Sequence, residues 1–111
     1  MNRSTCCDFN DFVKAMADET RQRILALLQQ GEMNESDIVA DIKMTQPTVS
    51  YHLALLRRAN LVLARREGKH VFYRANQSCV IECCSEIESR FMMSLEEPGR
   101  KAFSQEGDPD V

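Results

Sequence analysis

The sequence predicts a mostly α-helical domain that carries one β-hairpin, and three observations predict it. Apolar residues recur at helical spacing in several stretches, each preceded by an Asp, Asn or Thr that can cap a helix. Residues 61–75 instead alternate apolar and basic residues around Gly68, which is typical of a hairpin. With 111 residues, 43% of them hydrophobic and 28% charged, the chain has the size and composition of a single folded domain.

Each expected helix begins just after a residue whose side-chain oxygen can accept a hydrogen bond from the first turn. The expected caps and helices are Asp8 with residues 8–17, Asp18 with 19–30, Asn34 with 35–43, Thr45 with 46–59 and Asn76 with 77–97. Gly31 is expected to end the second helix, and Pro47 fits the first turn of the fourth. The residues expected to be buried are Phe9, Phe12, Val13, Met16, Ile24, Leu27, Leu28, Ile38, Val39, Ile42, Val49, Leu53 and Leu56.

The expected organisation is one domain, over residues 9–97, between two short flanking segments. Residues 1–8 form an N-terminal arm that carries cysteines, and residues 98–111, after Pro98 and Gly99, form a disordered polar tail. The N-terminus does not resemble a signal peptide, and no segment is apolar enough to cross a membrane. A cytoplasmic protein with reduced thiols is therefore expected.

The third and fourth expected helices, joined by a tight turn, read as a helix-turn-helix, and the hairpin that follows reads as a wing. Residues 43–74 contain seven Lys or Arg and a single acidic residue, for a net charge of +6. The segments before and after them carry −4 and −5. A basic segment between acidic flanks indicates a nucleic-acid-binding face, although a merely solvated basic face stays open.

The residues expected to contact DNA lie on the exposed side of the fourth helix and on the wing, because a helix fits the major groove. They are Gln46, Thr48, Ser50, Tyr51, His52, Arg57 and Arg58 on the helix and Arg66, Lys69 and His70 on the wing. Arg57 and Arg58, further along the helix, suit phosphate contacts. For His52, a packing or hydrogen-bonding role is an open alternative.

Three cysteines, Cys79, Cys83 and Cys84, occur within six residues of the last expected helix. Cys79 and Cys83 are one helical turn apart, whereas Cys84 falls on the far side of an apolar stripe. A third thiolate for one ion could come from Cys6 or Cys7. The alternatives are that Cys84 is only a small buried side chain and that the arm has no role.

The stretches ADETRQRILALL, TQPTVSYHLALLRRANLV and REGKHVFYR resemble the ArsR/SmtB family of bacterial winged-helix repressors, and the resemblance covers residues 9–95. It implies a homodimeric winged helix-turn-helix that reads an inverted repeat in double-stranded operator DNA. It also implies that the first and last helices form the dimer interface. The interface residues would be Val80, Cys84, Ile87 and Phe91 with Phe9, Phe12 and Met16. The alternative is that these stripes cover the protomer's own core.

The resemblance also implies what the cysteines sense. The Cys-x-Cys of some relatives is absent from the third helix, and no histidine follows His70 for a zinc site. Other arsenic sensors of the family carry adjacent cysteines near the N-terminus or late in the chain, and this sequence has both. The resemblance therefore implies As(III) or Sb(III) as the inducer. The ligands would be Cys79, Cys83 and Cys84, with Cys6 and Cys7 from the partner protomer. Cd(II) or Pb(II) would need four thiolates.

Other hypotheses for the function fit the same sequence. A thiol-based redox or persulfide sensor could use the same fold and the same cysteines. The protein could also bind DNA without any sensing site. A thiol enzyme is not expected, because the sequence has no glycine-rich anion-binding loop beside a cysteine.

Overall fold

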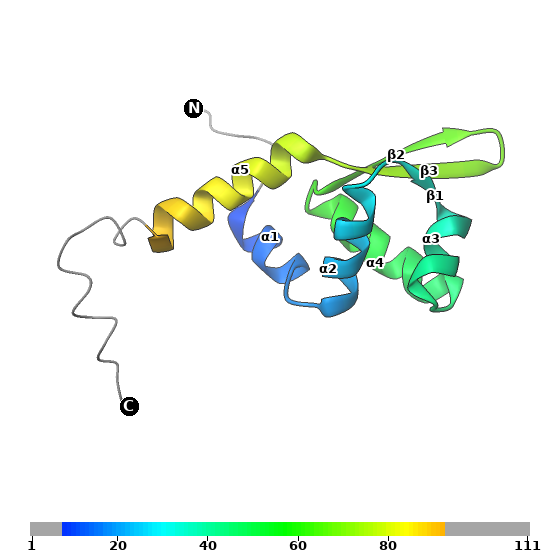
Figure 1. The fold of residues 1–111 in the computed structure, drawn as a ribbon, viewed down its shortest axis with the longest axis horizontal. Coiled ribbons are helices and arrows are strands. Elements are labelled where there is room, and N and C mark those ends of the chain that lie inside the picture. Colours follow the sequence, from blue (N-terminus) through cyan, green and yellow to red (C-terminus); the bar gives the residue numbers. More distant parts are fainter. Residues whose placement is uncertain (1–7, 93–111) are drawn as a thin grey trace.

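The computed structural model describes residues 8–92, in which helices pack beside one small sheet at an edge of the molecule (Figure 1). The helices are α1 (Phe9–Ala15), α2 (Glu19–Leu28), α3 (Glu35–Ile42), α4 (Gln46–Arg58) and α5 (Gln77–Ile87), which continues into a π-helical turn, η1 (Glu88–Met92). The strands are β1 (Met33–Asn34), β2 (Val62–Glu67) and β3 (His70–Ala75). The predicted winged helix-turn-helix fold is confirmed. The expected arm before Asp8 and the expected tail lie outside the described residues.

Four of the five predicted caps are confirmed, because their side chains accept hydrogen bonds from backbone N–H groups in the first turn. Asp8 accepts from Asn10 at 2.9 Å and from Asp11 at 3.1 Å. The other three bonds are Asp18 from Arg21 at 3.1 Å, Asn34 from Asp37 at 2.9 Å and Thr45 from Thr48 at 3.4 Å. The bond from Arg21 holds the pKa of Asp18 below its ordinary value, so this cap is a carboxylate.

The prediction for Asn76 is correct in position and wrong in mechanism. Asn76 precedes α5, but its side chain makes no capping bond. Its oxygen accepts from the Ser78 hydroxyl at 3.3 Å. Its amide nitrogen, which can only donate, lies 3.0 Å from the Asn60 carbonyl. The side chain therefore connects α5 to the end of α4.

Two helices end in the left-handed conformation, which the sequence analysis did not predict. Lys43 follows α3 with φ 64°, and Asn60 follows α4 with φ 62°. At Asn60 the N–H of Leu61 bonds the Leu56 carbonyl at 3.0 Å, and the N–H of Asn60 bonds the Arg57 carbonyl at 2.9 Å. These two bonds are the Schellman arrangement, which reverses the chain and leads it directly into β2.

The wing is a hairpin in which Val62–Glu67 pairs with His70–Ala75, as predicted. Gly68 has φ 62° at the first position of a two-residue loop, and Lys69 has no positive φ, which matches a type II′ turn. The third strand was missed, because β1 is only two residues long and shows no alternation. It pairs Met33 with Tyr73 and Asn34 with Phe72, so the sheet order is β1-β3-β2.

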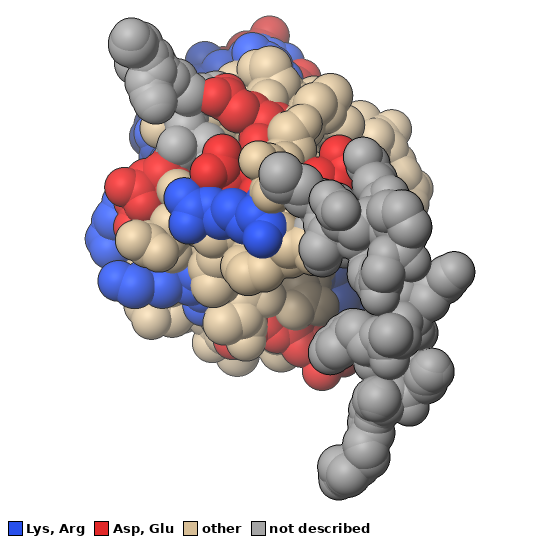
Figure 2. All heavy atoms as spheres, turned by 90° about the vertical axis from the view of Figure 1, so that its left-hand side faces the viewer, with Lys and Arg blue, Asp and Glu red and all other residues tan. Residues whose placement is uncertain are grey.

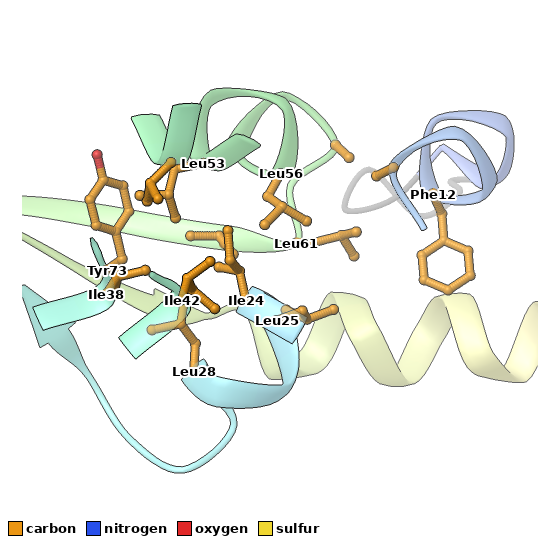
Figure 3. Close-up of a cluster of buried hydrophobic side chains, with 14 of the residues drawn as sticks. Phe12, Ile24, Leu25, Leu28, Ile38, Ile42, Leu53, Leu56, Leu61 and Tyr73 are labelled. Carbon is orange, nitrogen blue, oxygen red and sulfur yellow. The ribbon is translucent and has the colours of Figure 1, made fainter. Parts of the chain in front are cut away.

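The core is built from α2, α3, α4 and the sheet, with Phe12 of α1 directed toward α5 (Figure 3). Every residue of the predicted α4 stripe is buried. The prediction is wrong for Val13, which is 47% exposed, because the seven-residue α1 buries only Phe12 and Ala15. In α2 the buried neighbour of Ile24 is Leu25, and Leu27 is partly buried. The helix also ends at Leu28, before Gly31.

The wing and α5 extend in opposite directions from the helical core (Figure 1). The tip of the wing and the far end of α5 therefore lie on opposite sides of the protomer (Figure 1). Among residues 8–92 no helix has the length and apolarity needed to span a membrane.

We expect Ile24→Ala to lower the free energy of unfolding by about 2–5 kcal/mol, because the side chain is fully buried and its removal leaves a cavity. Urea denaturation followed by circular dichroism, at a fixed protein concentration, measures this loss. Arg23→Ala is the matched control on the same helix, since Arg23 is exposed, and it should change stability by no more than about 0.5 kcal/mol. Equal losses from the two variants would contradict the placement of α2.

Candidate nucleic-acid interface and cysteine site

The residues predicted to contact DNA through α4 differ in how far solvent reaches them. Gln46, Thr48 and Tyr51 are exposed, with Tyr51 at 60%, and Ser50 is half-buried. These four residues lie in the first two turns of the helix. Their polar groups are therefore available at the end of α4 that would enter a groove first.

His52 lies on the buried side of α4 and is only 8% exposed. Its Nδ1 is 3.1 Å from Nη1 of Arg21, and a guanidinium can only donate, so this ring nitrogen is an acceptor. The same Arg21 donates through Nε to the carbonyl of Ala15, at the end of α1, at 2.8 Å. Of the two roles left open for His52, the structure shows the hydrogen-bonding one. Through Arg21 it connects α4 to α1.

The predicted basic contacts are all exposed. Arg57 and Arg58 lie in the last turn of α4, and Arg66, Lys69 and His70 lie at the tip of the wing. None of these side chains takes part in an ion pair with another residue of the described range. The charges of the three arginines and the lysine are therefore not neutralised by a neighbouring carboxylate of the described part.

Arg65, one residue before Arg66, is different. It donates to both carboxylate oxygens of Glu32 at 2.8 and 2.9 Å and to Glu67 at 2.9 Å, and it stacks over Phe72 at 4.6 Å. The bond from Arg65 lowers the pKa of Glu32, and Glu32 in turn raises the pKa of Arg65. Arg65 therefore joins the segment before β1 to the wing.

Glu35 of α3 has a role that the sequence did not predict. Its carboxylate accepts hydrogen bonds from the Ser50 hydroxyl, from Gln46 Nε2 at 3.5 Å and from the Tyr73 hydroxyl at 3.4 Å. Burial raises the pKa of Tyr73, and the charge of Glu35 adds to that effect. One side chain of α3 thus joins two predicted DNA-contacting residues of α4 to β3. Glu35 directly follows a cap, which by itself indicates only a favourable helix-dipole contact.

Cys79 and Cys83 lie on the inward face of α5, with 0% and 1% exposure, and each is disulfide-bonded in this structure. The prediction of reduced thiols, which came from the expected compartment, is therefore wrong for these two cysteines in this structure. Cys84 is an exposed, free thiol. Cys84 therefore lies away from Cys79 and Cys83, as expected, and it is not buried within the single protomer.

The predicted ligands are not assembled within the described part of the chain. No group of three or more His, Cys, Asp or Glu between residues 8 and 92 is arranged to hold a metal ion. Cys79 and Cys83 share one face of α5, while Cys84 faces another way. Cys6 and Cys7 lie outside the described residues.

Asn76 connects the cysteine site to the end of α4. Its Nδ2 lies 3.2 Å from the sulfur of Cys79 and 3.0 Å from the carbonyl of Asn60. Its backbone N–H donates to the carbonyl of Leu61 at 2.9 Å. One asparagine therefore contacts both a cysteine sulfur and the turn that separates α4 from the wing.

The outer face of α1 and α5 is partly apolar. Val13, Ile81 and Phe91 are exposed, with Phe91 at 64%, whereas Phe12 is buried in its own protomer. The ring of Phe9 lies 6.4 Å from Phe91 and 4.2 Å beneath the guanidinium carbon of Arg90. Seen from this side, acidic and basic side chains are interspersed with uncharged surface outside the grey atoms (Figure 2). This face does not form a continuous basic field.

Comparisons with known proteins agree with this geometry. The family "Bacterial regulatory protein, arsR family" matches residues 18–63. The transcriptional repressor SdpR of Bacillus subtilis is 36% identical over 67 residues, which cover 60% of this chain and 74% of that protein. The arsenical resistance operon repressor of Escherichia coli is 47% identical over 62 residues, covering 55% of this chain and 53% of that relative.

The match to the arsenical repressor thus spans about half of its length. A solved homodimeric winged helix-turn-helix DNA-binding domain, Mb0332 from Mycobacterium bovis, has a TM-score of 0.61 and 29% identity, and the match covers 79% of this chain and 83% of that one. These proteins are transcriptional regulators and DNA-binding domains, not enzymes. The chain belongs to the arsR family of bacterial regulatory proteins.

Proposed function

We propose that the protein is a homodimeric repressor whose two α4 helices enter successive major grooves of an inverted repeat in double-stranded DNA. Exposed polar residues in the first turns of α4 support this placement, since groove contacts usually come from the start of a recognition helix. The basic residues of the wing tip and of the last turn of α4, which form no ion pair within residues 8–92, would contact phosphates.

The proposed dimer interface combines α1 and α5. Three large apolar side chains, Val13 of α1, Ile81 of α5 and Phe91 of η1, are exposed in the single protomer. A second copy would bury them, as expected for an interface. Phe12 is not available for it because it already packs in its own core. The homodimeric Mycobacterium relative supports this assembly.

The proposed inducer is As(III) or Sb(III), bound by thiolates of α5, with Cd(II) or Pb(II) as alternatives that need more thiolates. Sulfur-rich sites of low coordination number suit these soft ions. The arsenical repressor relative supports the choice. Cys79 and Cys83 are the central pair, because they share one face of the helix. Cys84, Cys6 and Cys7 are candidates for the remaining ligand.

Binding of the metalloid requires reduced thiols. When arsenous acid reacts with two thiols, two As–S bonds replace two As–O bonds, and the thiol protons leave with the hydroxides as two waters. The disulfides of Cys79 and Cys83 would first have to accept two electrons each from a cellular dithiol.

The proposal that ion binding releases DNA rests on the position of Asn76. Its amide contacts the sulfur of Cys79 and the carbonyl of Asn60, where α4 ends. An ion on that sulfur takes up its lone pairs and shifts its position, so the hydrogen bond to Asn76 changes. The end of α4 and the base of the wing would respond, and the dimer would lose its match to the operator.

A second candidate function is a thiol-based redox or persulfide-sensing repressor. The specific observation that favours it is that Cys79 and Cys83 are disulfide-bonded. Each disulfide forms when two thiols lose two electrons and two protons to an oxidant such as peroxide. In this case oxidation, and not a metalloid, would alter operator affinity.

We expect Arg66→Ala to weaken binding to every DNA duplex and to reduce the salt slope of binding by about 1 for each wing, because one phosphate contact is lost. Fluorescence anisotropy at several salt concentrations measures the slope. Arg65→Ala is the neighbouring control, since Arg65 is occupied by Glu32, and it should leave the slope nearly unchanged. A larger change for Arg65→Ala would sink the proposed wing contact.

We expect arsenite to lower the affinity of the reduced protein for the promoter DNA of its own gene by roughly 5- to 150-fold, the usual range of allosteric coupling. The double variant Cys79→Ser with Cys83→Ser should bind DNA normally and lose this response. Cys84→Ser tests whether Cys84, the third cysteine of α5, contributes a ligand to the ion. If arsenite and antimonite leave affinity unchanged while peroxide lowers it reversibly, the redox candidate replaces the metalloid one.

We expect Asn76→Ala to separate ion uptake from DNA release. The variant should still take up arsenite, measured by mass spectrometry of the native protein, while the loss of DNA affinity becomes at least several-fold smaller than in the wild type. Gln77→Ala is the control, because Gln77 is the next residue and is exposed. If arsenite lowers the DNA affinity of Asn76→Ala as much as that of the wild type, coupling does not pass through Asn76. The proposal that arsenite is the inducer would not be contradicted by that result.

A further inference from the structure

A carboxylate lies among the predicted DNA-contacting groups, which is unexpected beside a polyanion. Glu35 is partly buried at the first residue of α3. It accepts from Ser50 and Gln46 of α4 and from Tyr73 of β3. No positively charged side chain of the described range forms an ion pair with it. Its hydrogen-bond partners within that range are the neutral donors of α4 and the wing strand.

We propose that Glu35 is a positioning residue that sets the DNA sequence preference by holding the side chains of Gln46 and Ser50 in one arrangement. This inference rests on the proposed placement of α4 in the major groove. It adds a specificity-determining residue from α3 that need not contact a base itself.

A side chain that is free to rotate can change the groups that it presents to DNA. A free glutamine samples many rotamers, and its amide can present either a donor or an acceptor to a base edge. A bond from Gln46 Nε2 to Glu35 favours rotamers in which the amide oxygen is left for the DNA. The bond from Ser50 fixes the direction of its hydroxyl hydrogen. An ordered pattern of donors and acceptors discriminates between bases better than a mobile one.

Tyr73 holds the carboxylate from the other side. Tyr73 is buried, and its hydroxyl donates to the second oxygen of Glu35 at 3.4 Å. The two oxygens thus have different partners: one faces α4 and the other faces the sheet. The carboxylate is therefore oriented by the wing strand before any DNA arrives.

The test compares specific with non-specific affinity. A duplex selected by the wild-type protein from a random-sequence library is measured against a scrambled duplex, and the ratio of the two affinities is the readout. We expect Glu35→Ala to reduce this ratio by roughly 5- to 50-fold, about the cost of one mismatched base pair. Affinity for the scrambled duplex should stay equal or rise, because a negative charge is lost.

Two matched variants separate the explanations. Glu35→Gln keeps an oxygen that can accept from Ser50 and should retain the ratio to within about threefold, whereas a pure charge effect would make it behave like Glu35→Ala. Asp37→Ala removes another acidic side chain from the same first turn of α3, one that makes no hydrogen bond to a described residue. Its ratio should match the wild type. Equal ratios for Glu35→Ala and Asp37→Ala, with both variants folded by circular dichroism, overturn the proposal.

A double variant tests whether Glu35 acts through its partners. In a background of Gln46→Ala with Ser50→Ala, adding Glu35→Ala should change the ratio no further. An additional loss would show that Glu35 acts in another way. If Gln46→Ala and Ser50→Ala alone leave operator affinity unchanged, the proposed DNA face is wrong and the role of Glu35 falls with it. If they lower affinity while Glu35→Ala does not, only the positioning role fails.

Discussion

The burial of one face of α4 is the contact on which the rest of the structure depends. Val49, Leu53 and Leu56 are almost fully buried in the core shared with α2 and α3 (Figure 3). Because a helix is rigid, fixing this face also fixes which residues point outward. It leaves Gln46 and Thr48 exposed and brings His52 inside, where Arg21 meets it.

Much of this fold could be predicted because its signals are local. A capping residue and an apolar stripe lie within one helix, so Asp18 with Ile24, or Thr45 with Leu53, could be found from spacing alone. The contacts that could not be predicted join residues far apart in the chain. Arg65 and Glu32 are 33 residues apart, Arg21 and His52 are 31, and Tyr73 and Glu35 are 38. No periodicity encodes such pairs.

The cysteine site could likewise be predicted only in part from local spacing. Spacing placed Cys79 and Cys83 on one side of α5 and Cys84 on another, and the structure agrees. Spacing did not reveal which side faces the core, because α5 has apolar residues on both. The inward side packs on its own protomer, and the outward side carries the exposed Ile81. Periodicity reports the angle between residues around a helix, and only the neighbouring elements decide its orientation.

The left-handed residue at Asn60 has a consequence for how this domain could vary. Helix α4 passes into the hairpin through a reversal at one residue, which two backbone hydrogen bonds hold in place. Because the turn at Asn60 has no additional residues, an insertion or deletion there would rotate the whole hairpin about the axis of α4. The hairpin tip is open-ended and could lengthen freely. Relatives that bind DNA in the same way should therefore differ in hairpin length and keep this junction intact.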